Sequence, residues 1–459
     1  MPCFDAHLIA QIGKSEWQLQ KPNVICGFCI DSRRLKSGEL FVALKSYKND
    51  GHDYLAHAKE AGASGALVAQ LKQQVPLAQL PVEDPLASLT SLAAQHRRSF
   101  KHPIIGITGS CGKTSTKDLL QQLLDRPQTL ATSANENNAI GVPLSLLKLD
   151  ASHRYGVIEV GISARDEMAP LAQCLSPDYS IITCIAPAHL SGLGSLSRIA
   201  AEKAVLAHHT STSGCVSFPA HCLTYPPFRE LDRNCLVVAE AHEASCIDLP
   251  QGKGQVVRAS ITFSNGWGQL TLQLGSAAPT TFRVKTLSRG LLSNAALALG
   301  LAQVLGVPEA KLHQRLASWQ PSPLRGEWRS TGNKHFYVDC YNANPISFVD
   351  SIAAFERTAP AALPRLYLLG SMNELGEESE HWHQEAVKDL KLRSNDSVYL
   401  LGQYASAFQK GLLSRSQQGA TIELIDAKEE VLPILRRFQG AVLLKASRSY
   451  ALEEILTHL

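Results

Sequence analysis

The chain has 459 residues, of which 45% are hydrophobic and 19% are charged, and its formal net charge is +3 at pH 7. This composition excludes an intrinsically disordered chain, and the small net charge argues against a partner held by overall charge, such as nucleic acid or an anionic membrane. At roughly 150 residues per domain, the length predicts about three domains.

The cysteines and the first residues indicate a reduced, cytoplasmic protein. Eleven cysteines is an odd number, so a complete set of intrachain disulfides is impossible. Cys26 and Cys29 have CxxC spacing without a second pair, and we expect buried thiols there. The chain carries Asp5 early and has no basic start before an apolar run, so no signal peptide is expected. The longest uncharged stretch, 290–308, contains polar residues and glycines, and it predicts a buried helix rather than a membrane span.

Short strands and helices are predicted over residues 1–98, which form a small α/β domain. The run 39–44 (ELFVAL) follows a turn and predicts a strand. Residues 53–69 predict a helix, a glycine stop and a second strand. An amphipathic helix with a basic last turn is expected over 87–100.

Strands and helices then alternate through a second domain, 99–320, which predicts a parallel sheet with both faces covered. The apolar strands are expected at 104–108, 154–161 and 178–186. A change to β-rich sequence over residues 212–285 predicts an antiparallel insertion or subdomain before the helix near 290–305.

A third alternating block, 321–459, predicts another open, Rossmann-like α/β sheet. Its expected strands share a short apolar core and lie in segments 335–344, 364–371, 396–403, 420–425 and 440–447.

The motif that carries the most chemistry lies between the strand at 104–108 and the helix after it. Gly106-Ile-Thr-Gly-Ser-Cys-Gly112-Lys113-Thr114 satisfies the phosphate-loop pattern GxxxxGK[ST]. Glycines allow backbone N–H groups to approach phosphate oxygens, and the helix N-terminus adds its positive dipole end. Lys113 would neutralise the terminal phosphates, and Thr114 would offer its hydroxyl to Mg²⁺. The motif therefore predicts binding of a nucleoside triphosphate in a central P-loop domain.

Three later residues have positions that suit a metal site. Glu159 ends an apolar strand beside the phosphate loop, where a carboxylate is well placed to hold Mg²⁺. His189 follows another strand, and Lys203 lies on a predicted helix. The pattern alone favours a structural role for His189 and an ordinary solvated lysine at position 203.

Four segments in this region together resemble the Mur ligase family, the ATP-dependent amide-forming ligases of peptidoglycan precursor synthesis. They are TGSCGKTSTK (108–117), NENNAIGVPLSLL (135–147), VIEVG (157–161) and AHLSGLGSLSRIAAEK (188–203). Further segments resemble those members that add D-alanyl-D-alanine to UDP-N-acetylmuramoyl-tripeptide: IDSRRLKSGELFVALK (30–45), DCYNANPISF (339–348), SMNELGEESEHWH (371–383) and LLKASRSYALEEIL (443–456). The matches occur in order over nearly the whole chain.

The resemblance implies roles for individual residues. It implies that ATP is bound by Gly109, Ser110, Cys111, Gly112, Lys113, Thr114, Ser115, Asn138, Asn294, Arg325, Asp339 and Asn342. It implies a two-magnesium site with Thr114, Glu159, His189 and a carbamylated Lys203 as ligands, and it implies catalytic roles for Lys113, His189, Lys203 and Arg325. The implied substrate-binding residues are Ser32, Arg33, Lys45, Asn344, Ser447 and Arg448.

Simpler roles remain open for several of these residues. Asn342 and Asn344 are also suited to capping a helix that begins at Pro345. Arg33 is compatible with an ordinary surface residue, Arg448 with an ion pair to Glu453 or Glu454, and Cys111 with a tolerated filler of the loop.

Several positions depart from the family pattern, among them Leu324, which stands where a glycine is expected, and the segment GISARDEM (161–168) after Glu159. Gly290 and Leu291 stand where the family often has a His-Asn pair, and Ser371 stands where it has an aspartate. The phosphate and metal residues are intact.

The resemblance implies a cytoplasmic monomer that activates a carboxylate with ATP as an acyl phosphate, which an amine then attacks. Its cofactors would be ATP, Mg²⁺ and CO₂ held as a lysine carbamate, and its substrates would be UDP-N-acetylmuramoyl-tripeptide and D-alanyl-D-alanine. The first domain would hold the UDP-sugar, the second ATP and the third the dipeptide.

Two other functions are open. One is another ligase of the superfamily, such as a folylpolyglutamate synthetase, with a different amine substrate; segments 339–345 and 372–379 argue against it. The other is a nucleotide-dependent switch, which would not need the set Glu159, His189 and Lys203.

Overall fold

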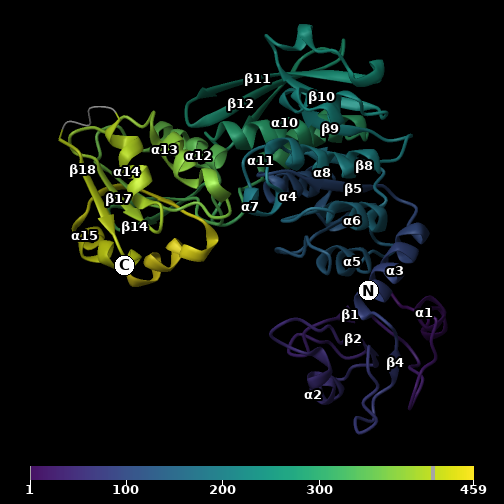
Figure 1. Ribbon diagram of the computed structural model, residues 1–459. Helices are drawn as coiled ribbons and strands as arrows, with labels where there is room; N and C mark the ends of the chain where they lie inside the picture. The colour runs from purple at the N-terminus through teal and green to yellow at the C-terminus, as the bar shows by residue number, and fades with distance from the viewer. Residues whose placement is uncertain (1, 415–418) are drawn as a thin grey trace.

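The computed structural model describes residues 2–414 and 419–459. Figure 1 shows three parts, each built around its own sheet, with the C-terminal part lying to one side of the central part and the N-terminal part below it. This arrangement confirms the predicted three-domain α/β architecture. Within the described ranges no helix has the length and apolar character that a membrane span requires.

The N-terminal part contains a four-stranded parallel sheet in the order β1-β2-β3-β4. Its elements are α1 (Ala6–Gly13), β1 (Phe28–Cys29), β2 (Leu40–Val42), the 3-10 turn η1 (Gly51–Tyr54), α2 (Leu55–Glu60), β3 (Gly65–Val68) and β4 (Gln79–Pro81). The strands predicted at 39–44 and near 65–69 are present as β2 and β3.

Helix α3 (Pro85–Ser99) leads from this part to the central part. It begins two residues before the predicted range because the Asp84 carboxylate accepts hydrogen bonds from the N–H groups of Leu86 and Ala87, and Pro85 suits the first helical position. At its other end the buried Arg97 donates to the Leu175 carbonyl at 3.0 Å. Helix α3 is therefore tied to the central part.

The central part is one nine-stranded sheet in the order β13-β12-β11-β10-β9-β8-β5-β7-β6. Its strands are β5 (Ile104–Thr108), β6 (Thr129–Ala131), β7 (Tyr155–Glu159), β8 (Tyr179–Ile182), β9 (Val216–Pro219), β10 (Cys235–Glu240), β11 (Gly254–Ser264), β12 (Trp267–Leu274) and β13 (Thr280–Val284). The β-rich stretch is thus not a separate subdomain. Its first strands continue the parallel sheet, and only β11, β12 and β13 pair in antiparallel fashion.

Helices cover both faces of this sheet because alternate strand residues point to opposite sides. Ile105 and Ile107 of β5 join the core beneath α4 and α10, whereas Ile104 joins the core that includes α6 and α8. The helices are α4 (Lys113–Leu123), α5 (Gly141–Leu146), α6 (Met168–Leu175), α7 (Leu190–Leu193), α8 (Leu196–His208), α9 (Pro226–Arg229), α10 (Arg289–Val304) and α11 (Glu309–Ala317). Short 3-10 turns lie at η2 (Arg126–Gln128), η3 (Ala220–Thr224), η4 (Ala244–Cys246) and η5 (Pro250–Gly252).

The C-terminal part has a six-stranded sheet in the order β14-β15-β19-β16-β17-β18, parallel except for the β14–β15 hairpin. Its strands are β14 (Glu327–Thr331), β15 (Lys334–Val338), β16 (Arg365–Gly370), β17 (Ser397–Leu401), β18 (Thr421–Ile425) and β19 (Gly440–Lys445). The five predicted strands are all present, and β14 is an additional one. Its helices are α12 (Pro345–Thr358), α13 (Ser379–Val387), α14 (Ala405–Leu413) and α15 (Leu432–Arg437), with turns η6 (Gly376–Glu378), η7 (Lys428–Val431), η8 (Arg448–Tyr450) and η9 (Leu452–His458).

Strand order places the site in the central sheet. Strand β5 lies between β7 and β8, and the chain moves to opposite sides of β5 to form its two neighbours. Open α/β sheets bind ligands beyond the carboxyl ends of their strands at such a reversal point. The phosphate-loop sequence begins where β5 ends.

Candidate active site

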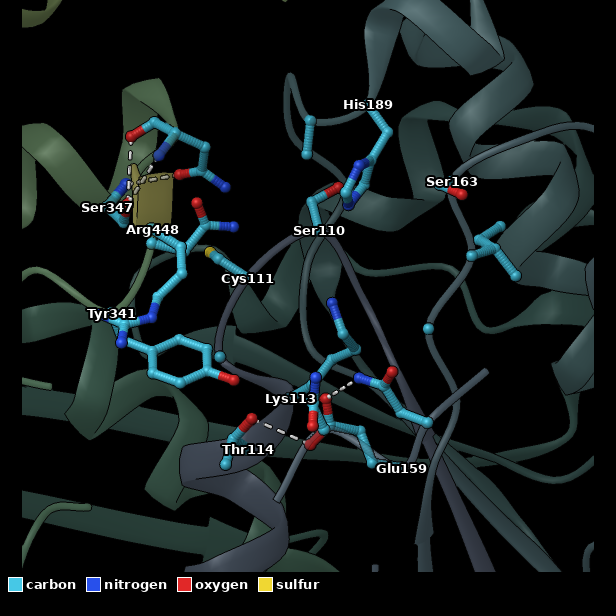
Figure 2. Close-up of a pocket in the computed structure, with 18 of the residues that line it drawn as sticks. Ser110, Cys111, Lys113, Thr114, Glu159, Ser163, His189, Tyr341, Ser347 and Arg448 are labelled. Carbon is cyan, nitrogen blue, oxygen red and sulfur yellow. Dashed lines mark hydrogen bonds between the residues drawn. The ribbon is translucent and has the colours of Figure 1, made fainter. Parts of the chain in front are cut away.

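A cavity of about 960 Å³ lies at this reversal point, between the central and C-terminal parts. Figure 2 shows Tyr341 and Arg448 of the C-terminal part facing Cys111 and Lys113 of the phosphate loop. The predicted site residues that line it are Ser110, Cys111, Gly112, Lys113, Thr114, Ser115, Asn138, Glu159, His189, Asn294, Arg325, Asp339, Asn342, Asn344 and Arg448.

The phosphate loop joins β5 directly to α4 and needs glycine at two positions. Gly109 and Gly112 have φ values of 153° and 80°, which L side chains rarely adopt. A Cβ on Gly109 would lie 1.8 Å from Thr183 Oγ1, and one on Gly112 would lie 2.4 Å from Asn294 Nδ2. The same contact explains the place of Asn294, which packs from α10 against the loop. The Lys113 ammonium donates to the Gly109 carbonyl at 2.8 Å, so it lies folded over the loop.

Glu159 lies at the end of β7, beside the first turn of α4. Its carboxylate is buried, and its two oxygens accept from Thr114 Oγ1 at 2.9 Å and from Asn137 Nδ2 at 2.7 Å (Figure 2). Asn137 was not predicted, although it stands next to the predicted Asn138 in the same run. Asn138 accepts hydrogen bonds from the N–H groups of Ile140 and Gly141 and so shapes the start of α5.

The pair Thr114 and Glu159 suits a hard divalent cation, because Mg²⁺ prefers carboxylate and hydroxyl oxygens. No cluster of three or more His, Cys, Asp and Glu side chains placed to hold a metal occurs in the described part of the chain. The protein ligands of a metal here would therefore have to include other groups, such as the Thr114 hydroxyl.

His189 connects the two parts that enclose the cavity. Its backbone is left-handed, with φ 54°, and its Nδ1 is hydrogen-bonded to the Glu374 carboxylate of the C-terminal part. The carbonyl of Glu374 also accepts from the Ser191 N–H at 3.2 Å. Burial lowers the pKa of His189, and the Glu374 charge opposes that shift. Glu374 was not predicted, since a surface acid 185 residues away gives no sign of this contact.

Lys203 is buried on α8 behind the phosphate loop and does not line the cavity. Burial, followed by the charge of Lys113, lowers the pKa of Lys203 to about 7. A buried lysine of this kind carries a substantial neutral fraction at neutral pH, which is the nucleophilic form.

Arg325 reaches the phosphate loop from the segment that leads into the C-terminal part. Its Nη2 donates to Thr114 Oγ1 at 3.0 Å, and its guanidinium lies 4.1 Å from the centre of the Tyr341 ring. The Arg448 guanidinium lies 6.0 Å from the same ring and also pairs with Glu453, as the simpler interpretation predicted. Tyr341 thus holds cationic groups toward the cavity, a role that the sequence did not show.

Asp339 stands where β15 ends and is paired with the buried Lys445 at the end of the neighbouring β19, with Nζ and Oδ2 3.0 Å apart. Lys445 was not predicted, because an apolar run ending in lysine does not show which strand is its neighbour. Its ammonium also donates to the Asn342 carbonyl at 3.1 Å. Asn344 caps α12 through the Ser347 N–H at 2.8 Å, in agreement with the capping alternative, and it lines the cavity as well.

Four predicted substrate residues do not line the cavity. Ser32, Arg33 and Lys45 belong to the N-terminal part, where Ser32 Oγ lies 2.8 Å from His57 Nδ1. Arg33 pairs with Asp31 on the surface, and Lys45 lies 3.7 Å from the Asp50 carboxylate. Ser447 is buried and accepts from the Asn373 N–H at 2.9 Å.

The positions that depart from the family pattern have structural partners. The Gly290 N–H and the Ser288 hydroxyl both donate to the Asp350 carboxylate of α12, at 3.1 Å and 2.5 Å. Burial raises the pKa of Asp350. Ser371 is buried and donates to the Leu401 carbonyl at 3.2 Å.

Comparisons with known families match the chain in three consecutive segments. Residues 24–97 match the model "Mur ligase family, catalytic domain", 107–302 match "Mur ligase middle domain" and 324–448 match "Mur ligase, glutamate ligase domain". The order of the matches follows the three parts of the fold.

Individual relatives match over nearly the same length. The UDP-N-acetylmuramoyl-tripeptide–D-alanyl-D-alanine ligase of Treponema pallidum is 29% identical, over 94% of this chain and 92% of the relative. The protein of that name from Synechocystis is 30% identical, over 82% of this chain and 79% of the relative.

Two solved structures extend the comparison. MurF from Acinetobacter baumannii matches with a TM-score of 0.85 and 25% identity, over 100% of this chain and 99% of that one. MurF from Thermotoga maritima in complex with ADP matches with a TM-score of 0.77 and 26% identity, over 94% and 96% of the two chains. With its sequence and its three-part fold both matched from end to end, the chain belongs to the Mur ligase family.

Proposed function

We propose that the chain uses ATP to join the amine of D-alanyl-D-alanine to the terminal carboxylate of UDP-N-acetylmuramoyl-tripeptide. The observation that carries this proposal is the similarity to ligases of that name over more than nine-tenths of both chains. The cavity supports it, because it brings the phosphate loop of one part against cationic and polar groups of another. Such a reaction would take place in the cytoplasm, where nucleotide-linked precursors are made, and the protein would act as a monomer.

A carboxylate needs activation because oxide is a poor leaving group. Transfer of the γ-phosphoryl group of ATP to the carboxylate gives an acyl phosphate and ADP. The amine of the dipeptide then adds to the acyl carbon, and the tetrahedral intermediate expels phosphate to leave an amide. Catalysis of the first step rests on charge stabilisation at the moving phosphoryl group.

The residues around the phosphate loop supply that stabilisation in the proposal. Loop N–H groups and Lys113 hold the phosphates, and Arg325 approaches them from the other side of Thr114. Thr114, Glu159 and His189, with Lys203 as a carbamate, would hold Mg²⁺, which stabilises negative charge on phosphoryl oxygens. Asp339 would contact the nucleotide from the C-terminal part.

The three parts divide the substrates in this proposal. Residues 1–98 would hold the UDP-sugar through Ser32, Arg33 and Lys45, and 99–320 would bind ATP. Residues 321–459 would bind the dipeptide near Asn344, Ser447 and Arg448. Enclosure between the second and third parts would protect the acyl phosphate from water.

Phosphate release measured across amine substrates tests the proposal. We expect release with ATP, UDP-muramoyl-tripeptide and D-alanyl-D-alanine together, and none when the dipeptide is replaced by L-alanine, L-lysine or D-glutamate. Tripeptides ending in diaminopimelate and in lysine should both be offered. A rate that does not depend on the dipeptide would contradict the proposal, and a matched Lys113→Ala preparation controls for contaminating ATPases.

A further inference from the structure

Two cysteine side chains meet at the back of the phosphate loop. Cys111 belongs to the loop itself, and Cys184 follows β8 by two residues. Their Sγ atoms are 3.2 Å apart. The ligase reaction proposed above uses neither thiol, so their proximity requires another explanation.

Hydrogen bonds fix the two segments that carry these thiols. The Ser110 N–H donates to the Cys184 carbonyl at 3.0 Å. The Ser110 hydroxyl donates to the Ala186 carbonyl at 2.8 Å and accepts from the Ala186 N–H at 2.9 Å. The Thr183 hydroxyl donates to the Cys111 carbonyl. A disulfide bond is about 2.05 Å long, so the sulfurs would have to approach by only about 1.1 Å to form one.

The pair differs from the other cysteines of the chain in its surroundings. Cys111 lines the cavity, and the residues Cys111 and Cys184 are partly exposed, whereas Cys174, Cys215, Cys222, Cys235 and Cys340 are buried. A hydrogen bond from Cys111 lowers the pKa of Cys184, and the charge of Lys113 lowers it further. The hydrogen bond with the Cys184 thiol, followed by burial, raises the pKa of Cys111. The two thiols are therefore unequal, with Cys184 the better nucleophile.

We propose that Cys111 and Cys184 are a dithiol that hydrogen peroxide oxidises to a disulfide, and that this disulfide weakens nucleotide binding by the phosphate loop. The Cys184 thiolate attacks one peroxide oxygen, breaks the O–O bond and becomes a sulfenic acid as hydroxide leaves. The Cys111 sulfur then attacks the Cys184 sulfur, and the sulfenic oxygen leaves as water with the thiol proton. Each thiol loses one electron, and the peroxide is reduced to two molecules of water.

The expected effect follows from the place of Cys111. Its backbone N–H is among those that would cradle phosphate oxygens. Such donors must be held within about 0.5 Å of the positions in which they bind the ligand. Drawing the two sulfurs together by about 1.1 Å strains the loop on which those donors lie. By thermodynamic reciprocity, a nucleotide that binds the dithiol more tightly than the disulfide must disfavour the disulfide by the same factor. Bound ATP should therefore protect the pair.

The test measures nucleotide binding and chemical linkage rather than ligase turnover. The full-length protein is treated with hydrogen peroxide, with and without MgATP, digested without reductant and mapped by mass spectrometry. We expect a peptide pair joining Cys111 to Cys184, lighter by two hydrogens, and an affinity for a fluorescent ATP analogue reduced about tenfold or more. Dithiothreitol should restore the affinity, and MgATP should slow the linkage.

Variants separate this pair from other thiols. Cys184→Ser should form no linkage, and its affinity for the ATP analogue should be the same before and after peroxide treatment. Cys246→Ser, which removes an exposed thiol elsewhere, should respond to peroxide like the wild type. If peroxide forms no linkage between Cys111 and Cys184 in the wild type, that result alone overturns the proposal. Linkage with unchanged affinity would overturn it too, as would an equal loss in Cys184→Ser. Because the readout is nucleotide binding, these outcomes do not depend on which amine the enzyme uses.

Discussion

Replacement of Lys203 by alanine tests the proposed carbamate most directly. Carbamate forms only from a neutral amine and CO₂. With a pKa of about 7, roughly three quarters of Lys203 would be neutral at pH 7.5, whereas an exposed lysine with a pKa of ~10.4 is neutral at about one part in a thousand. The buried amine is therefore several hundred times better prepared for the reaction than a surface lysine.

The assay combines spectroscopy with kinetics. In ¹³CO₂-equilibrated buffer at pH 7.5, the wild type should show a ¹³C carbamate signal that Lys203→Ala lacks. Turnover in the variant should fall about 100-fold or more, since a metal site supplies several kcal/mol of transition-state stabilisation. Short carboxylates such as formate or acetate should restore part of it, because they can occupy the space of the lost carbamate.

Lys117 provides a matched control. It is also a buried lysine of the central part, but its ammonium donates to the Thr132 carbonyl at 2.8 Å and pairs with Asp118 at 2.7 Å. Because these partners already engage its amine, Lys117→Ala should leave the carbamate signal intact. A signal that persists in Lys203→Ala, or full turnover in that variant, would refute the reasoning.

Three further predictions concern the same site. Glu159→Gln should weaken Mn²⁺ binding in the presence of ADP by about 100-fold, measured by electron paramagnetic resonance, because one anionic oxygen ligand is lost; unchanged binding would remove Glu159 from the metal site. Glu374→Gln should weaken the same Mn²⁺ binding by about tenfold, as expected for a group that orients a metal-bound histidine. The nearby variant Glu377→Gln should leave Mn²⁺ binding unchanged. Equal effects of the two variants would contradict an orienting role for Glu374. In CO₂-free buffer, Lys203→Met should raise Tm most at pH 6.5 and progressively less toward pH 9.5. The sign follows because the folded pKa of about 7 lies below the unfolded value, so the buried charge is destabilising below pH 7 and that cost disappears as pH rises. A Tm difference that does not change with pH would contradict this assignment.

Much of the central part could be predicted from local sequence. A buried strand, a glycine turn and a helix specify the phosphate loop over the nine consecutive residues 106–114, and the alternation of elements specifies a parallel sheet. The β-rich stretch was predicted only in part. Its last three strands, β11, β12 and β13, do pair antiparallel, but local pattern did not show that the stretch extends the central sheet. Strands β9, β10 and β11 prove to be parallel continuations of the central sheet, and strand order is a property of the whole domain.

The sequence by itself determined the elements, the phosphate loop and the family resemblance, because each depends on residues close together in the chain or on ordered motifs. Only the tertiary structure decided which distant groups meet. Arg325 contacts Thr114, Glu374 contacts His189, and Lys445 pairs with Asp339, across separations of 211, 185 and 106 residues. Cys111 and Cys184 are brought together in the same way, by the pairing of β5 with β8. Such contacts depend on strand order and on how the three parts pack, and a linear pattern of residue types carries no information about either.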